Sequence, residues 1–84
     1  MKLIFADEAW EDYLYWQKQD KRMVERINKL VREIQREAFA GIGKPEALKH
    51  ALSGFWSRRI TDEHRMVYRV DAGALLIAQL RFHY

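Results

Sequence analysis

The sequence predicts an α+β fold in a single domain, with a short N-terminal strand and a two-helix hairpin packed on an antiparallel β-meander, in the order β-α-α-β-β-β. Three features of the chain predict this class. Apolar residues recur at helical spacing over residues 7–38 and alternate at strand spacing over residues 55–83, and glycine and proline cluster between these two regions. A chain of 84 residues has room for one domain only.

The first expected elements are a brief strand over residues 2–5 and a helix that begins at Asp7. Aspartate is a favoured N-cap residue, and the acidic residue after it suits the positive end of a helix. The helix is expected to reach about Gln19, because apolar residues recur at i, i+3 and i+4 within it. These residues are Trp10, Tyr13 and Leu14.

A second, more clearly amphipathic helix is expected after Asp20, which is another candidate N-cap residue. Its apolar stripe has spacings of 4, 3, 1, 3 and 4 residues, which is typical of a helix with one buried face. The stripe consists of Met23, Ile27, Leu30, Val31, Ile34 and Ala38. We interpret this stripe, together with Trp10, Tyr13 and Trp16, as core; Trp16 or Trp56 could also serve a dimer surface.

A long loop is expected between the helices and the meander, because Gly41, Gly43 and Pro45 interrupt regular structure and no period is sustained until about Ser53. Long ordered loops in small domains tend to be functional. The polar residues of this loop are Lys44, Glu46, Lys49 and His50.

The meander is expected to consist of strands over residues 55–60, 65–70 and 75 to about 83. Alternation predicts which side chains meet the helices: Met66, Tyr68 and Val70 from one strand, and Leu76, Ala78, Leu80 and Phe82 from the next. The opposite, open face then carries Arg65, Arg81 and His83, and Arg59 joins them if the first strand has the matching register. A shift of one residue would undo this alignment.

The composition favours an acidic or polyanionic partner in the cytoplasm. The net charge is +3, and the excess of basic residues lies in the second half of the chain. The chain has no cysteine, which excludes disulfides and thiolate metal sites, and His50, His64 and His83 are too dispersed to suggest a metal centre. No apolar run approaches the length of a signal peptide core or a membrane span, so we expect a soluble protein without membrane association.

The residue types suit RNA cleavage without a metal or other cofactor. Such a reaction needs a base for the ribose 2′-OH, a cation for the phosphorane and an acid for the leaving oxygen. Glu46 is a candidate base, Arg59 and Arg65 can make forked contacts to phosphate, and His83 is the natural candidate acid, since histidine is the side chain suited to proton transfer near neutral pH. Tyr84 adds an aromatic face on which a base could stack.

Several segments resemble the YoeB toxins, a branch of the RelE-like bacterial toxins. The strongest are residues 43–50 (GKPEALKH), 52–60 (LSGFWSRRI), 63–68 (EHRMVY) and 81–84 (RFHY), and the likeness extends through residues 12–17 and 20–22 to essentially the whole chain. The resemblance implies a RelE-like fold over residues 1–84. It also implies an mRNA endonuclease that cuts in the A site of the 70S ribosome.

The resemblance implies roles for six residues. Glu46 corresponds to the general base, His83 to the general acid and Arg65 to the group that stabilises the transition state, while Tyr84 positions the nucleotide. The contacts to phosphate or substrate are implied for Lys49 and Arg59. The implied partners are mRNA on the ribosome, a YefM-like antitoxin with an acidic C-terminal tail, a second copy of the chain, and operator DNA only through the antitoxin complex.

Two other functions remain open on the sequence: a gyrase-inhibiting toxin like the sister ParE branch, and a nucleic-acid-binding module without chemistry. A pure binder needs arginine and lysine but no acid-base pair, so Glu46, His83 and Tyr84 favour the nuclease. Arg58, Arg69 and Arg81 are interpreted as solvated strand positions or antitoxin contacts as readily as substrate ligands, and we leave them outside the catalytic set.

Overall fold

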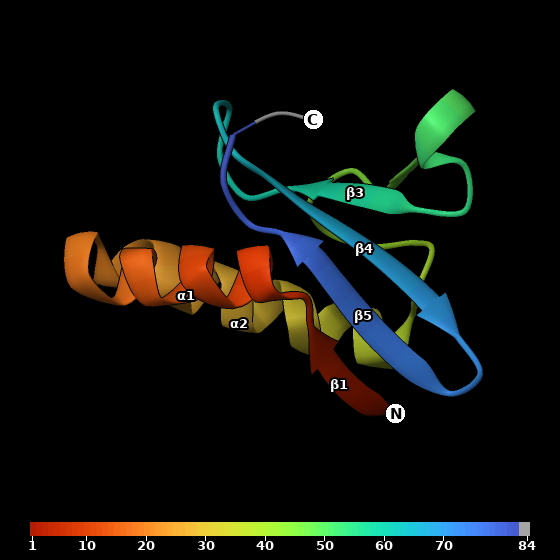
Figure 1. Cartoon of the computed structure of the whole chain (residues 1–84), viewed down its shortest axis with the longest axis horizontal. Coiled ribbons are helices and arrows are strands. Elements are labelled where there is room, and N and C mark those ends of the chain that lie inside the picture. The colour runs from red at the N-terminus through yellow and green to blue at the C-terminus, as the bar shows by residue number, and fades with distance from the viewer. Residues whose placement is uncertain (83–84) are drawn as a thin grey trace.

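The computed structural model describes residues 1–82 and confirms the predicted fold class (Figure 1). It adds two features to the prediction. The first strand pairs in parallel with the last one, and a two-residue strand forms within the predicted long loop. The elements are β1 (Lys2–Phe5), α1 (Asp7–Gln19), α2 (Lys21–Arg36), β2 (Glu46–Ala47), a 3-10 turn (His50–Leu52), β3 (Trp56–Arg59), β4 (Arg65–Asp71) and β5 (Ala74–Gln79).

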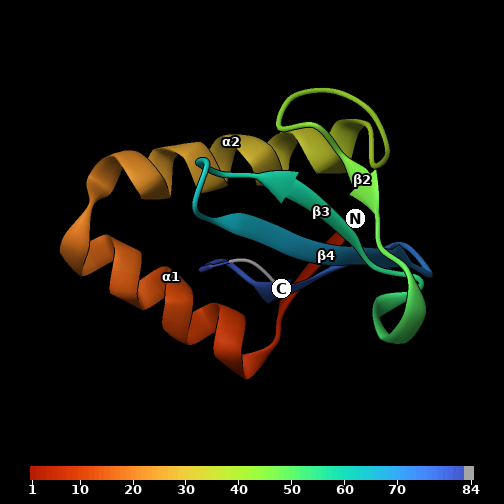
Figure 2. The same ribbon diagram turned by 90° about the horizontal axis from the view of Figure 1, so that it is seen from above.

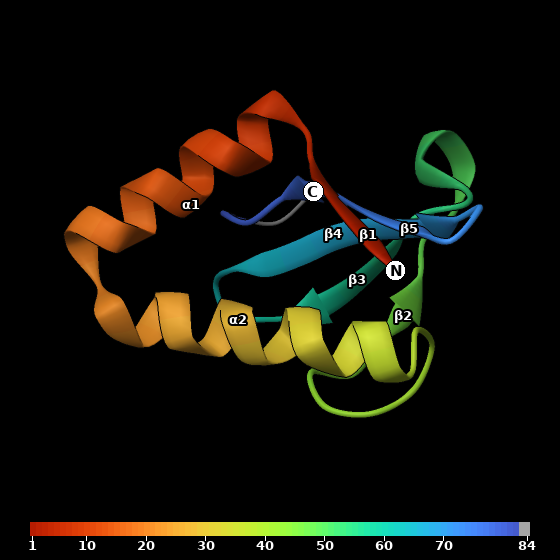
Figure 3. The same ribbon diagram turned by 90° about the horizontal axis from the view of Figure 1, so that it is seen from below.

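The strands form one mixed sheet in the order β1-β5-β4-β3-β2, and both helices pack on the same face of it (Figure 3). The predicted stripe of α2 is buried as far as Ile34, and Asp20 caps this helix by accepting a hydrogen bond from the Arg22 N–H at 3.0 Å. Burying these aliphatic side chains supplies most of the driving force for folding. Among the described residues, neither helix is long and apolar enough to cross a membrane.

The tryptophans of α1 behave differently from one another. Trp16 is buried as predicted, and its Nε1–H donates to the Leu80 carbonyl at 3.0 Å. The expectation that Trp10 is core is wrong, because it is 48 % exposed, although its ring meets Phe5 edge-on and stacks with Tyr13. Trp10 lines an open hollow between β1, α1 and α2 instead.

The predicted faces of β5 are wrong because of a β-bulge. Val67 pairs with Gln79 while its neighbour Tyr68 pairs with Ile77, so Ala78 is an extra residue without a partner. As a result Leu75 and Ile77, rather than Leu76 and Ala78, belong to the core. Beyond the bulge the side chains alternate as predicted, and Leu80 is fully buried as expected.

Arg81 does not lie on the open face on which it was expected, because β5 ends at Gln79, two residues before it. Its guanidinium carbon lies 3.6 Å from the centre of the Tyr15 ring on α1, within cation–π contact. The regular ladder ends at Gln79, short of the predicted strand end near His83. Residues 80–82 are therefore held largely by side chains, as described below.

Arg58 is fully buried, which corrects its interpretation as a solvated strand position. Its guanidinium donates to the carbonyls of Glu37, Ala40 and Ile42 at 2.8 to 3.0 Å, and its Nε–H donates to the Tyr68 hydroxyl at 3.2 Å. These carbonyls belong to the loop that leaves α2 and leads to β2 (Figure 2). Arg58 thus ties that loop to the sheet.

Tyr68 completes this arrangement by donating its hydroxyl proton to the Ala38 carbonyl at 2.8 Å. Burial raises the pKa of Tyr68 above its ordinary value of 10.0, although the adjacent Arg58 acts in the opposite direction. Gly43 passes so close to α2 that a Cβ there would lie 3.0 Å from Leu30 Cδ2, and its φ of 82° favours glycine. The loop therefore delivers Glu46 to the edge of β3 in a fixed position.

Candidate functional site

The face of the sheet opposite the helices, called the open face here, carries the predicted polar residues. Cross-strand pairing places Glu46 beside Ser57, Ser57 beside Val67, and Val67 beside Gln79, so these four residues form one row across β2, β3, β4 and β5. Side chains of directly paired residues lie on the same face. The Glu46 side chain is exposed at the end of this row.

Two arginines form the next row of the open face. Arg59 and Arg65 are direct cross-strand partners, which confirms the prediction that they share a face. Like charges placed opposite each other in a sheet are unfavourable. Asp62 offsets part of this repulsion at 3.5 Å from Arg59, but the Asp62 carboxylate is almost fully exposed to solvent, so the pair contributes little. An anion bound between the arginines would relieve the repulsion.

The Arg65 side chain reaches from its own row back toward Glu46. Its Nη1 lies 3.4 Å from Ser57 Oγ, and Ser57 is the direct cross-strand partner of Glu46. Neighbouring strands lie ~4.8 Å apart, so a guanidinium above Ser57 and a carboxylate on Glu46 are separated by about one strand spacing. A single phosphodiester could touch both groups. Glu46 forms no ion pair within residues 1–82.

Of the remaining predicted site residues, the structure describes only Lys49. Lys49 directly precedes the 3-10 turn, and its carbonyl accepts from the Leu52 N–H at 3.1 Å while its side chain is exposed. It lies on the segment that follows β2, at the same end of the sheet as Glu46. His83 and Tyr84 lie outside the described residues. Within residues 1–82 no three histidine or carboxylate side chains converge as they would at a metal site.

Three further residues lie at or near this face. Arg69 lies on the open face four residues beyond Arg65 on β4, and it was left outside the catalytic set because it is as readily a solvated strand position or an antitoxin contact as a substrate ligand. Gln79 and His64 hold the chain after β5 through side-chain hydrogen bonds. Gln79 could have been noticed as a polar residue in an apolar strand, whereas no sequence signal marks the contact of His64.

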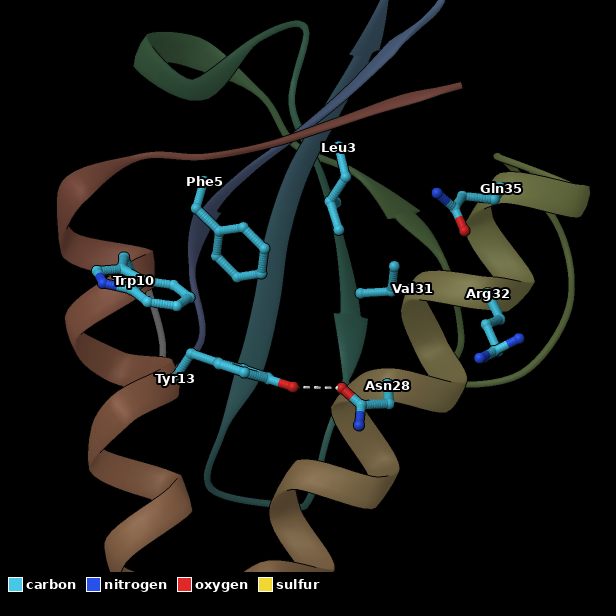
Figure 4. A pocket seen from close by; sticks show the side chains of 8 residues that line it. All are labelled: Leu3, Phe5, Trp10, Tyr13, Asn28, Val31, Arg32 and Gln35. Carbon is cyan, nitrogen blue, oxygen red and sulfur yellow. Dashed lines mark hydrogen bonds between the residues drawn. The ribbon is translucent and has the colours of Figure 1, made fainter.

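A hollow lies between β1, α1 and α2, on the helix side of the sheet (Figure 4). It has a volume of about 420 Å³ and is lined mainly by apolar side chains, with a Tyr13 hydroxyl that donates to Asn28 Oδ1 at 2.7 Å. Its apolar lining includes Leu3, Phe5, Trp10 and Val31. Neither Glu46 nor Arg65, the predicted catalytic residues within residues 1–82, lines it, so the open face remains the candidate site.

Two helices on one face of this five-stranded sheet, with an arginine pair and a carboxylate on the other face, define the RelE-like class of toxin folds. The chain belongs to the YoeB-like toxins of bacterial type II toxin-antitoxin systems, whose family model matches residues 5–84. The resemblance seen in the sequence is thereby confirmed.

Individual relatives agree over their full length. The chain is 62 % identical to the toxin YoeB of Escherichia coli K12 over 84 residues, which is all of both chains. It is similar to a solved YoeB/ParE toxin from Agrobacterium tumefaciens, with 55 % identity, complete coverage of both chains and a TM-score of 0.98. YoeB of Staphylococcus aureus, 49 % identical with coverage of 100 % and 98 %, was solved as a dimer (TM-score 0.94) and in a heterotetrameric complex with YefM (TM-score 0.93).

Proposed function

We propose that residues 1–84 act as one RelE-like toxin domain, a ribosome-dependent endoribonuclease that cuts mRNA in the ribosomal A site and so inhibits translation. The observation that carries this proposal is the Arg65 guanidinium held against Ser57, one strand away from the exposed Glu46 carboxylate. A base and a phosphate-binding cation at this separation suit attack within one nucleotide.

The proposed chemistry needs no metal. The Glu46 carboxylate takes the proton of the ribose 2′-OH, and the 2′-oxygen attacks the adjacent phosphorus. Arg65 stabilises the negative charge of the phosphorane through forked hydrogen bonds. The bond from phosphorus to the 5′-oxygen then breaks, His83 gives that oxygen a proton, and the products are a 2′,3′-cyclic phosphate and a free 5′-OH. Tyr84 positions the nucleotide.

Substrate binding is proposed for Arg59 and Lys49. Arg59 lies directly opposite Arg65, so it can contact the phosphate next to the scissile one, and Lys49 lies on the segment that follows Glu46. These contacts contribute to affinity for the RNA backbone and lower it at high salt. Their loss is therefore expected to raise KM more than it lowers kcat.

The proposal is tested by adding purified protein to translating ribosomes and mapping mRNA 5′ ends by primer extension. We expect cuts within A-site codons by the wild type, and a loss of about 10² to 10⁴-fold in rate for Glu46→Gln, because a general base contributes that much. Glu25→Gln is the matched control, since Glu25 is an exposed carboxylate on α2. It should cut at the wild-type rate.

Intact mRNA with folded wild-type protein would refute the nuclease. A parallel supercoiling assay with gyrase identifies the ParE-like alternative, which predicts inhibition of gyrase and no dependence on Glu46. Ribosome binding of Glu46→Gln, measured by cosedimentation, should equal that of the wild type. If binding is lost together with cutting, Glu46 is a docking residue rather than a base.

The proposed partners follow from the family and from the charge of the open face. A YefM-like antitoxin with an acidic C-terminal tail neutralises the protein in the cytoplasm, since such a tail complements the Arg59 and Arg65 pair. The complex, rather than the toxin alone, binds operator DNA, and the free toxin forms a homodimer. Copurification with the product of an adjacent short reading frame, and its release at high salt, would test the first of these partnerships.

A further inference from the structure

The chain after β5 is held by side chains from three separate elements. Asp12 on α1 accepts from the Leu80 N–H at 3.0 Å, and Trp16 donates to the Leu80 carbonyl at 3.0 Å. Gln79 donates from Nε2 to the Arg81 carbonyl at 2.9 Å. The regular ladder with β4 has ended by this point, so individual hydrogen bonds hold residues 80–82.

Phe82 is held on both sides of its Cα. Its N–H donates to Nδ1 of His64 at 2.8 Å, and its carbonyl accepts from the N–H of Arg65 at 3.1 Å. Phe82 has a φ of 60°, a left-handed conformation that costs a residue with a side chain ~1 kcal/mol and persists only where its surroundings enforce it. Two hydrogen bonds, to His64 just before β4 and from Arg65 at the start of β4, provide this enforcement.

His64 is itself held rigidly. Its ring lies edge-on to Trp16 with centroids 4.8 Å apart, and its carbonyl accepts from the N–H groups of Ile60 and Thr61. An imidazole nitrogen that accepts a hydrogen bond carries no proton, so the proton of the neutral ring is on Nε2. The His64 ring is therefore a fixed acceptor for the chain that approaches it.

We propose that His64 is a positioning residue for the last two residues of the chain. By holding the Phe82 N–H, it sets the direction of the Phe82 carbonyl, the group to which His83 is covalently attached, beside the backbone of Arg65. The proposal rests on the nuclease function proposed above, in which His83 and Tyr84 take part. His64 neither contacts RNA nor exchanges a proton with it.

The test compares two amides that differ by one methylene. In His64→Asn the oxygen Oδ1 is bonded to Cγ, as Nδ1 is in histidine, so it can accept from Phe82. In His64→Gln the oxygen lies one bond farther out and misses that position. We expect His64→Asn to keep kcat within about threefold of the wild type, and His64→Gln to lose about 10 to 100-fold in kcat with little change in KM, because small displacements of a reacting group cost that much.

A second measurement detects the hydrogen bond from Phe82 to His64 without depending on catalytic activity. In the free protein, the Phe82 amide should exchange its hydrogen slowly in the wild type and in His64→Asn, and as fast as an exposed amide in His64→Gln. Equal exchange or equal kcat in the two variants would overturn the role of His64, as would a fast Phe82 amide in the wild type. Failure of the wild type to cut mRNA would instead refute the nuclease, and the exchange experiment separates the two results.

Discussion

Replacing Arg58 by lysine is expected to destabilise the fold strongly although it conserves the charge. The guanidinium makes four hydrogen bonds in different directions, to the carbonyls of Glu37, Ala40 and Ile42 and to the hydroxyl of Tyr68. A lysine ammonium is a single point and cannot reach acceptors spread around a planar fork. At least two of the four hydrogen bonds are lost, while the charge stays buried.

The expected magnitude follows from these contacts. Hydrogen bonds to a charged group are worth ~1.5 kcal/mol each at the low end of their range, so losing two lowers the free energy of unfolding by about 3 kcal/mol. An unfolding entropy of about 2.1 cal/mol/K per residue over 84 residues converts this loss into a fall in Tm of about 17 °C. This is a large fraction of the stability of a small domain.

Urea unfolding followed by tryptophan fluorescence measures the effect at a fixed protein concentration, because dimerisation would add to the apparent stability. The matched control is Arg36→Lys, since Arg36 is a largely exposed arginine at the end of α2 whose guanidinium donates to the Glu33 carboxylate. It should change the free energy of unfolding by less than ~0.5 kcal/mol. If Arg58→Lys changed it equally little, the loop would not depend on the guanidinium and the reasoning would be refuted.

Two further predictions concern the same loop. Tyr68→Phe should reduce the loss of stability that the wild type shows above pH 10. Because the pKa of Tyr68 is raised in the folded state, the folded phenol stays protonated where the unfolded one ionises, and the free energy of unfolding of the wild type falls there by up to ~1.4 kcal/mol per pH unit. Urea titrations between about pH 9 and 11.5 should show a shallower fall with pH in the variant. Gly43→Ala should lower the Tm more than Gly73→Ala does. Both glycines have a positive φ, but only a Cβ at position 43 would lie close to Leu30 and Arg58. Equal Tm values for the two variants would show that the side chains around Gly43 move aside to accept the methyl group.

Much of the fold was predictable because local patterns agree with tertiary packing. The stripe of α2 was assigned from its spacing, and five of its six residues, from Met23 to Ile34, are buried. The same reasoning failed on β5, since alternation assumes an unbroken ladder and a bulge at Ala78 reverses it. A bulge depends on how two strands meet, and residues 74–82 contain no glycine that would have indicated one.

The candidate site was predictable in its residue types but not in its supports. Cross-strand pairing brings Arg59 and Arg65 together as alternation implied. The burial of Arg58 could not be inferred, because its acceptors are backbone carbonyls of a loop whose path depends on the fold. The contact of His64 with Phe82 likewise joins residues 18 apart through a backbone group, and backbone groups leave no trace in the sequence.

The parallel pairing of β1 with β5 has a consequence for the order in which the protein folds. Among the strands of residues 1–82, β1 has β5 as its only neighbour, so residues 2–5 must wait for residues 74–77 before they can pair. Closing so long a loop is entropically costly and delays folding. The pairing of β1 with β5 therefore comes late in folding, after the local contacts of the two helices and of the antiparallel strands.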